Sequence, residues 1–285
     1  MLAPITTNAS TDNQVIVMWL SGKASTSQVT YTSAVKQFLA FVGKGLKEVV
    51  LEDFQMWASS LEMRYNPNTV KLKVNTIKSL LSYGQKIGYL QFNVGSAVTA
   101  PKPKDTLAQR ILGIEDVKAL IGAAKTQRDR TLLALMYGCG LRVSELCGLT
   151  WNDLQPRDDG GQATVYGKCS KTRVVLIPSV LWQRLVSLSR SASTDAVFVS
   201  RTGRALERTM VHRIIKDCAF RAGVSQKASS HWLRHSHATH AIEGGCDLHL
   251  LQQSLGHSSL AITSKYLHAR PDQGSSQFVA AALED

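Results

Sequence analysis

Two prolines that alternate with lysines are the feature that most constrains how this chain can fold. They lie in VTAPKPK, residues 98–104. Proline lacks the backbone N–H that a helix interior needs, and it pushes the residue before it toward extended backbone. A helix cannot continue through this segment, so we predict a basic linker over residues 98–106 between two domains. A linker that lies along a DNA backbone and an ordinary solvated connector would share this composition.

The part of the chain before this linker has the apolar spacing of a helical domain. Apolar side chains recur at helical intervals in four stretches, residues 15–20, 31–42, 51–63 and 67–81. Glycines or Asn66-Pro67 separate the stretches, and proline costs little at a first helical position, where its missing N–H would be unpaired anyway. We therefore predict a disordered N-terminus over residues 1–10 and a helical domain over residues 11–97.

The part after the linker has a mixed pattern. Residues 116–124 and 128–137 have helical spacing, and a short helix is expected from Arg142. Runs rich in β-branched residues flank GKCSKT, which is typical of a hairpin with strands at 163–166 and 174–177, and residues 197–199 predict another strand. From residue 209 onward the spacing is helical again. We expect a mainly α protein with a small β-sheet, whose second domain covers residues 107–272.

The charge balance favours a polyanionic partner. The chain has 33 Lys and Arg against 21 Asp and Glu, a formal net charge of +12. Each phosphate that a cation neutralises releases condensed counterions, which favours binding to nucleic acid. Residues 63–104 have no Asp or Glu and seven basic residues, Arg64, Lys71, Lys73, Lys78, Lys86, Lys102 and Lys104. We interpret the lysines as a DNA-binding surface; the alternative is a solvated basic helix face.

Several classes of protein are disfavoured. The five cysteines are odd in number and have no CxxC spacing, which argues against a disulfide framework or a thiolate zinc site. No apolar run approaches the roughly 18–20 residues of a membrane span, and no secretory signal is evident. We therefore expect a cytoplasmic protein with no membrane partner.

Three polar motifs lie far apart in the second part of the chain. Arg142 follows a glycine-flanked turn, and a turn into a helix start presents N–H groups to an anion. In HWLRH, His231 and Arg234 are three apart and project from one helix face. Tyr266 follows His257 by nine residues in LGHSSLAITSKYLH, so a short helical turn must return the phenol beside the imidazole. These side chains suit phosphoryl transfer through a covalent tyrosine.

Each motif alone is more often structural, but together they resemble a known family. GLRVSELCGLTW, GKCSKTR, HWLRHSHATH and LGHSSLAITSKYLH are similar to the four signature segments of the tyrosine recombinase (phage integrase) family, and of its Xer-like members in particular. The resemblance covers residues 138–268. It implies a helical core-binding (SAM-like) domain followed by a mixed α+β catalytic domain. It also implies six catalytic residues, Arg142, Lys168, His231, Arg234, His257 and Tyr266.

The resemblance implies a role for each of these side chains. Arg142 and Arg234 would hold the scissile phosphate, because guanidinium groups match its oxygens in paired hydrogen bonds. His231 would accept the proton of the nucleophile Tyr266 or bond the phosphate, and His257 would donate to a phosphate oxygen. The phenol would form a 3′-phosphotyrosyl ester and release a 5′ hydroxyl, without metal, cofactor or ATP.

The proton for the leaving 5′ oxygen is expected from a lysine of the hairpin. Lys168 matches the family position, and Lys171 is the competitor three residues on. Family hairpins usually have glycine after this lysine, whereas this chain has Cys169. We prefer Lys168 as the proton donor.

Four histidines within ten residues invite a zinc interpretation. They are His231, His235, His237 and His240. Their spacing is not HExxH and no carboxylate lies among them, so we expect no metal. We expect His235 and His240 to pack or to form hydrogen bonds inside the domain. Glu145 is expected to orient a neighbouring group or to cap a helix.

The resemblance implies a site-specific recombinase that synapses double-stranded DNA as a homotetramer and exchanges strands through a Holliday junction. It would act with or without an accessory protein or a partner recombinase. Residues near 204–213 are further candidates for base contacts. The apolar tail over residues 273–285 would dock into a neighbouring subunit, or fold back in cis. A type IB topoisomerase-like enzyme and a catalytically silent DNA-binding factor are the alternatives.

Overall fold

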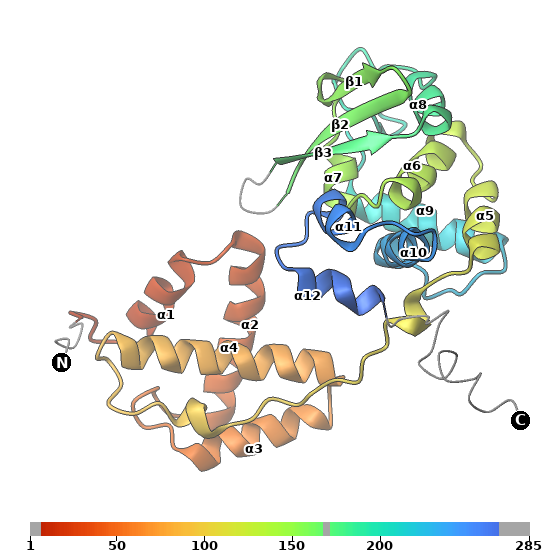
Figure 1. Cartoon of the computed structure of the whole chain (residues 1–285). Coiled ribbons are helices and arrows are strands. Elements are labelled where there is room, and N and C mark those ends of the chain that lie inside the picture. The colour runs from red at the N-terminus through yellow and green to blue at the C-terminus, as the bar shows by residue number, and fades with distance from the viewer. Residues whose placement is uncertain (1–6, 168–171, 268–285) are drawn as a thin grey trace, which may run out of the picture. The chain divides into compact units, whose positions relative to one another are not determined.

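The computed structural model describes residues 7–167 and 172–267 of the chain (Figure 1). The chain divides into two compact units, Met1–Asp105 and Thr106–Asp285. Each unit contains a hydrophobic cluster of its own, so the two are described separately. Lys168, Lys171 and the tail over residues 273–285 lie outside the described residues.

The first unit consists of helices in its described part. Their bounds are α1 (Asp12–Ser21), α2 (Ser25–Val42), α3 (Leu51–Glu62), α4 (Pro67–Lys86) and the short 3-10 helix η1 (Val94–Ala97). Local signals set the ends of these helices. Thr11 and Gln14 form a capping box at the start of α1, and Asn66 caps α4 with Pro67 at the first helical position. Gly43 ends α2 in the left-handed conformation, which glycine adopts without strain.

Aromatic rings form the centre of this unit. The ring centroids of Phe38 and Trp57 are 5.0 Å apart, and those of Phe38 and Phe54 are 5.4 Å apart. Helix α4 packs against α1, α2 and α3 and closes the cluster. Val98 is buried in the same cluster, and Lys78 Nζ donates a hydrogen bond to its carbonyl. The extended chain that follows, residues 99–105, has no helix or strand.

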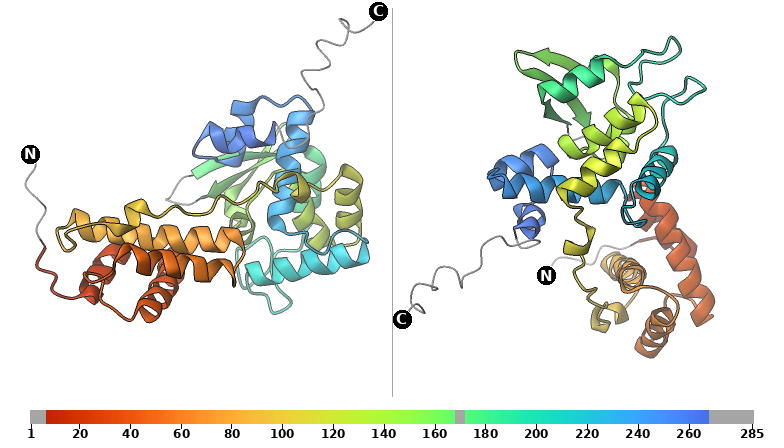
Figure 2. Two further views of the ribbon diagram at one scale, coloured as in Figure 1. Left: turned by 90° about the horizontal axis from the view of Figure 1, so that it is seen from below. Right: turned by 90° about the vertical axis from the view of Figure 1, so that its right-hand side faces the viewer.

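The second unit combines helices with a three-stranded antiparallel sheet in the order β1-β2-β3 (Figures 1 and 2). Its first half contains η2 (Ala108–Arg110), α5 (Ile114–Gly122), α6 (Gln127–Gly138), α7 (Val143–Cys147), η3 (Trp151–Asp153), β1 (Leu154–Arg157), β2 (Gly160–Tyr166) and β3 (Thr172–Ile177). Its second half contains α8 (Ser179–Val186), α9 (Arg208–Arg221), α10 (Ser230–Glu243), α11 (Leu248–Leu255), α12 (Leu260–Thr263) and η5 (Ser264–Tyr266).

The core of this unit lies between the sheet and α10. Alternate residues of β2 and β3 face inward, with Ala163 paired with Val175 and both buried. Helix α6 packs against α8 and α10 and is buried along most of its length (Figure 1). This arrangement fixes the start of α7 and the polar face of α10 on one framework.

The structure confirms the predicted mainly α fold with a small sheet. The predicted strand at 197–199 is wrong, because this stretch forms single bridges only, Thr150 with Ala196 and Val199 with Ala205. The apolar side chains that suggested a strand fill the core instead, and Phe198 is buried. Strand β1 was not predicted from the sequence. It contains Pro156 and exposed residues, which an edge strand tolerates.

Candidate active site

Helix α10 presents the HWLRH motif on one face. Arg234 and His235 lie three and four residues after His231, so all three side chains project from this face. His231 is the more exposed of the two phosphate-binding candidates on this face, and Arg234 is buried with 5% of its surface accessible. The Arg234 guanidinium donates to the carbonyls of Gly140 and Leu255, the second at 2.6 Å between Nη2 and the oxygen. Arg234 therefore joins α10 to the turn before α7 and to the end of α11.

Glycine at position 140 allows this turn to approach α10. Its φ is +59°, a conformation that other residues adopt only with strain. A Cβ atom there would lie 2.6 Å from His237 Cδ2 and 2.8 Å from Leu255 Cδ2. Both contacts are too short for real atoms, so the turn that leads to Arg142 requires glycine.

Arg142 occupies the cap position of α7 and remains partly open to solvent. Its Nη1 atom lies 2.7 Å from Glu145 Oε1, its backbone N–H donates to Glu145 Oε2, and its Nη2 donates to the carbonyl of Gly256 at 3.1 Å. The side chain keeps 35% of its surface exposed. Arg142 is thus held in place on one side and available to an anion on the other.

Glu145 connects Arg142 to a residue that sequence reasoning missed, Arg173 on β3. Arg173 donates from Nη1 and Nη2 to the two oxygens of Glu145, at 2.7 and 2.9 Å. Burial raises the pKa of Glu145, but the hydrogen bonds from Arg173 and Arg142 outweigh it and lower the pKa to about 2. The carboxylate is therefore ionised, and it both caps α7 and orients two guanidinium groups, the alternatives that the sequence left open.

Three arginines meet at the carboxyl end of α11. Its last carbonyls accept from a different arginine each: Ser254 from Arg173 Nε at 2.8 Å, Leu255 from Arg234 and Gly256 from Arg142. Carbonyls at a helix C-terminus lack partners within the helix and carry partial negative charge, so they attract cations. The end of α11 therefore gathers the three guanidinium groups beside His257, the next residue in the chain.

His257 and Tyr266 lie side by side after this helix end. The ring of Tyr266 stacks on that of His257, with centroids 6.3 Å apart and an interplanar angle of 14°. Thr263 Oγ1 lies 2.9 Å from His257 Nδ1 and holds the imidazole. Tyr266 is only 6% exposed, and its hydroxyl lies 2.8 Å from Nδ1 of His235. The structure thus brings Arg142, Arg234, His257 and Tyr266 into one site, with His231 at its exposed edge.

Burial and the arginines set the charge states of this site. Burial, with Arg234 and Arg142, lowers the pKa of His257 to about 4, and burial also lowers the pKa of His231. Burial raises the pKa of Tyr266 although Arg234 opposes the shift. Burial lowers the pKa of Arg234 to about 10, so the guanidinium stays charged at neutral pH. The site therefore presents cations, neutral imidazoles and a protonated phenol.

A cleft of about 830 Å³ opens on the Arg142 and His257 side of the site. Arg142, Arg173 and His257 line it, together with the hairpin ends at Tyr166 and Thr172. Lys168, the predicted proton donor, and its competitor Lys171 belong to this hairpin but lie outside the described residues. The described walls are basic and suit an anionic ligand.

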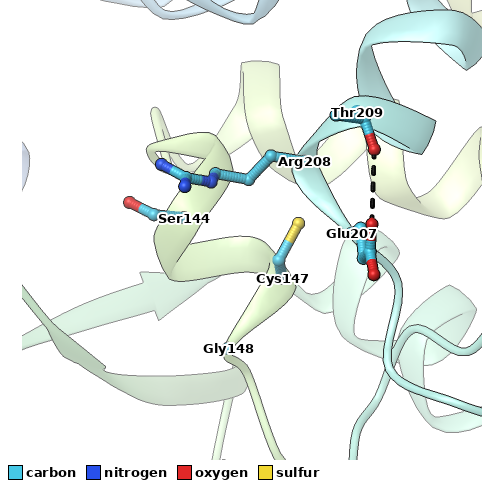
Figure 3. Close-up of a pocket in the computed structure, with 6 residues that line it drawn as sticks. All are labelled: Ser144, Cys147, Gly148, Glu207, Arg208 and Thr209. Atoms are coloured by element: carbon cyan, nitrogen blue, oxygen red, sulfur yellow. Dashed lines mark hydrogen bonds between the residues drawn. The ribbon is translucent and has the colours of Figure 1, made fainter. Parts of the chain in front are cut away.

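A second hollow of about 370 Å³ lies between α7 and the start of α9. In Figure 3, the side chain of Arg208 extends from α9 toward Ser144, and the sulfur of Cys147 points into the hollow from α7. Burial raises the pKa of Cys147 to about 11, although the charge of Arg208 lowers it. The thiol therefore stays protonated at neutral pH and is a poor nucleophile. Ser144 of α7 lines both hollows.

The histidines of α10 have separate partners. His235 bonds Tyr266, and His240 Nδ1 lies 2.9 Å from the hydroxyl of Tyr137. Within residues 7–167 and 172–267, no three His, Cys, Asp or Glu side chains are grouped in a way that could hold a metal ion. In the same described ranges, no helix is long and apolar enough to cross a membrane.

The predicted DNA-binding lysines differ in their surroundings. Lys71, Lys86, Lys102 and Lys104 are exposed. Lys73 is half-buried, with Nζ 4.9 Å from the centroid of the Tyr65 ring. Lys78 is half-buried too and donates to a backbone carbonyl of its own unit.

Known proteins resemble this chain over most of its length. The profile of the phage integrase family matches residues 110–273. A tyrosine recombinase of Pseudothermotoga lettingae is 32% identical over 249 residues, covering 84% of this chain and 86% of the relative. Tyrosine recombinase XerD of Pseudomonas aeruginosa is 31% identical over 278 residues, covering 90% and 91%.

Solved structures share the fold at low sequence identity. A lambda integrase tetramer bound to a Holliday junction has a TM-score of 0.75 and 18% identity, over 95% of this chain and 81% of that one. The XerH site-specific recombinase bound to palindromic difH substrate has a TM-score of 0.74 and 20% identity, over 98% and 92%. Fold and relatives define the tyrosine recombinase class. This chain belongs to the phage integrase family, and its resemblance to Xer-like members is confirmed.

Proposed function

We propose that this chain is a site-specific DNA recombinase that cleaves and rejoins DNA through a 3′-phosphotyrosyl intermediate, without metal or ATP. The observation that carries the proposal is the convergence at the end of α11. Arg142 and Arg234 are far apart in the sequence, yet they donate to successive carbonyls at this helix end. His257 is the next residue in the chain, and the ring of Tyr266 lies beside it. A phenol buried beside two anchored guanidinium groups suits covalent phosphoryl transfer. DNA binding alone would not require a buried phenol beside these arginines.

In this proposal the arginines bind the scissile phosphate. Arg142 reaches it from the exposed side of its side chain and Arg234 from the floor of the site. Guanidinium groups match phosphate oxygens in two hydrogen bonds. They stabilise the charge of the transition state, for which an arginine in an analogous enzyme contributes about 10³–10⁵-fold in rate. His231 and His257 donate hydrogen bonds to the same phosphate.

The covalent step transfers the phosphoryl group from DNA to the enzyme. The hydroxyl oxygen of Tyr266 attacks phosphorus, and the bond from phosphorus to the 5′ oxygen breaks. Lys168 supplies the proton that converts the leaving oxygen to a 5′ hydroxyl. The phosphotyrosyl ester retains the energy of the phosphodiester, so the 5′ hydroxyl of another strand can reverse the step without ATP.

The remaining parts of the chain bind DNA and assemble the recombinase. The helical domain over residues 11–97 and the linker bind duplex DNA through the exposed lysines. Four copies synapse two sites and exchange strands through a Holliday junction, which the tetrameric lambda integrase neighbour supports. The tail over residues 273–285 docks on a neighbouring copy. The enzyme works in the cytoplasm, with a partner recombinase or accessory protein as an open addition to the homotetramer.

The experiment is to map the DNA segments that the protein binds across its host genome and to offer them as nicked suicide duplexes. Recombination predicts a denaturant-resistant adduct on the 3′ phosphate at these sites, together with a free 5′ hydroxyl. Relaxation of supercoiled DNA of any sequence by a monomer would indicate a topoisomerase instead. Binding without an adduct would indicate a DNA-binding factor and overturn the proposal.

A further inference from the structure

The hydroxyl of Tyr266 meets an imidazole outside the six predicted catalytic residues. His235 Nδ1 lies 2.8 Å from the Tyr266 hydroxyl oxygen, and the ring centroids are 5.8 Å apart. His257, the other imidazole beside the phenol, stacks on its face and has Thr263 at its own Nδ1. His231 lies one helical turn before His235, with ring centroids 6.4 Å apart. His235 is therefore the imidazole placed to take part in chemistry at the phenol oxygen.

The fold holds this pair from two elements. His235 belongs to α10, where it directly follows the phosphate-binding candidate Arg234, and Tyr266 belongs to η5, which packs against α10. Both side chains are largely withdrawn from solvent. One helix face thus carries the proposed phosphate ligand and the partner of the proposed nucleophile on successive residues.

The charged groups around His235 determine which atom holds the proton. They are His231 and Arg234 on α10, Arg110 on η2 and the phenol of Tyr266 on η5. Burial, followed by the charges of His231, Arg110 and Arg234, lowers the pKa of His235 to about 4. The ring is therefore neutral near pH 7, and the phenol, whose own pKa burial raises, is protonated. In the tautomer that carries the ring proton on Nε2, the hydroxyl donates and Nδ1 accepts.

We propose that His235 is a catalytic residue that accepts the proton of Tyr266 when the phenol attacks DNA. This inference rests on the recombinase function proposed above. As the bond from the tyrosine oxygen to phosphorus forms and the bond from phosphorus to the 5′ oxygen breaks, the phenolic proton moves to Nδ1 of His235. The leaving oxygen takes a different proton, from Lys168. His231 is then left to bond the phosphate.

DNA binding strengthens His235 as an acceptor. A phosphate held by Arg234 brings negative charge to the arginine that neighbours His235 in the chain. That charge opposes the repulsion that keeps the free imidazole neutral. The acceptor thus gains basicity when substrate occupies the site, and the unoccupied enzyme keeps its phenol protonated and unreactive.

The same helix offers a matched control. His240 meets the hydroxyl of Tyr137 through Nδ1 at 2.9 Å, with ring centroids 5.8 Å apart, so the distances match those of the His235 pair. Tyr137 belongs to α6, away from the proposed nucleophile. A purely structural role for the His235 pair predicts that the two histidines respond alike to substitution.

The test compares His235→Asn with His240→Asn in cleavage of a nicked suicide duplex across pH 6–10. An asparagine oxygen can accept the hydroxyl hydrogen bond near the Nδ1 position, but it cannot take the proton. We expect H235N to slow cleavage about 10²-fold or more at neutral pH, the usual contribution of a general base. The deficit should shrink as pH rises toward the phenol pKa, because solvent then removes the proton. H240N should cleave at the wild-type rate throughout.

Different results would overturn the recombinase function and the role of His235. If the wild-type protein forms no adduct, the recombinase function is wrong. If the wild type cleaves and H235N matches it, or is slowed equally at every pH, His235 is not the proton acceptor. If H235N does not fold, nitrogen NMR of labelled histidines in the free protein tests the contact between His235 and Tyr266 instead. The Nδ1 signal of His235 must shift in Tyr266→Phe but not in Tyr137→Phe, and an unchanged signal overturns the inference.

Discussion

The two units of this chain bury different kinds of side chain. Among the described residues of Met1–Asp105, Thr76 is the one buried polar side chain, and it bonds the carbonyl of Leu72 within its own helix. The described part of Thr106–Asp285 buries several, including the carboxylate of Glu145 and the guanidinium of Arg234.

The buried side chains of the first unit serve the stability of the fold, whereas those of the second unit also serve the chemistry of the site. Burying apolar rings stabilises a fold, whereas burying a charge costs free energy unless the charge is paired and hydrogen-bonded. The second unit accepts that cost where α7, α10 and α11 meet, and it satisfies both charges: Glu145 has two arginines, and Arg234 has two backbone carbonyls. The first unit is stabilised around Phe38, Phe54 and Trp57. Substitutions should therefore affect folding in the first unit, and folding together with catalysis in the second.

The largest effect is expected at Arg234. Arg234→Met should lower the cleavage rate by about 10³–10⁵-fold, because a transition-state guanidinium is lost. It should also destabilise the second unit, since two carbonyls lose donors at about 1–3 kcal/mol each. Single-turnover cleavage and urea unfolding measure the two effects. Arg157→Met, at an exposed strand position, should change neither the cleavage rate nor the stability. An R234M protein that still cleaves at the wild-type rate would show that Arg234 is not needed for catalysis.

Trp57 should show the pure packing effect. Trp57→Ala should destabilise the first unit by about 3–5 kcal/mol, the usual cost of a cavity left by a large aromatic side chain. Met56, its neighbour on α3, is 64% exposed, and Met56→Ala should change stability by less than about 0.5 kcal/mol. Hydrogen exchange of the amides in α2, α3 and α4 reports both. Similar exchange in the two variants would contradict the packing account.

Glu145 should show the cost of an unpaired buried charge. Glu145→Gln leaves Arg142 and Arg173 without their carboxylate and should cost about 3 kcal/mol. The exposed pair of Glu115 and Lys118 is the control, and Glu115→Gln should cost no more than about 0.5 kcal/mol. Urea unfolding at pH 7 compares the two variants, and equal stabilities would show that the Glu145 pairs contribute little.

Acid should remove this difference. The folded-state pKa of Glu145, about 2, is below its ordinary value of 4.5, so its contribution is present above pH 4.5 and disappears as pH falls toward 2. The stability gap between wild type and E145Q should close over that range. A gap that persists at pH 2 would mean that the carboxylate charge is not its source.

A further effect, spread over several side chains, is a shift of stability with pH between 6.5 and 4. Burial, with nearby cations, lowers the pKa of His235 and His257 to about 4, and burial lowers that of His237 to the same value. Each imidazole binds fewer protons folded than unfolded, so the stability of the second unit is full above pH 6.5 and decreases toward pH 4. Urea midpoints across this range measure the decrease. A midpoint independent of pH would mean that these rings titrate normally.

Local signals explain what could be predicted from the sequence. Gly43 and Asn66-Pro67 mark helix ends by their own backbone preferences, and the hairpin strands have alternating burial. The strand prediction at 197–199 failed because its apolar residues serve the core, where Phe198 is buried, rather than a ladder. Local preference cannot distinguish these two uses of a short apolar run.

The missing parts of the site depend on long-range contacts. Arg173 meets Glu145 across 28 residues, and His235 meets Tyr266 across 31. Neither pairing has a spacing rule, since it arises only when β3, α7, α10 and η5 pack together. The sequence predicted that His235 packs or forms hydrogen bonds inside the domain, and it does form a hydrogen bond, but its partner Tyr266 could not be predicted.

The assignment of Tyr266 as the nucleophile is tested most directly by the covalent adduct that two tyrosine variants form with DNA. Tyr266 is buried beside His257, whereas Tyr166 is 63% exposed and lines the cleft that His257 also lines, so it is the rival phenol. With nicked duplexes that carry a mapped binding site, Tyr266→Phe should form no denaturant-resistant protein–DNA adduct, and Tyr166→Phe should still form it. An adduct that persists in Y266F, or is lost only in Y166F, would contradict the assignment of the nucleophile.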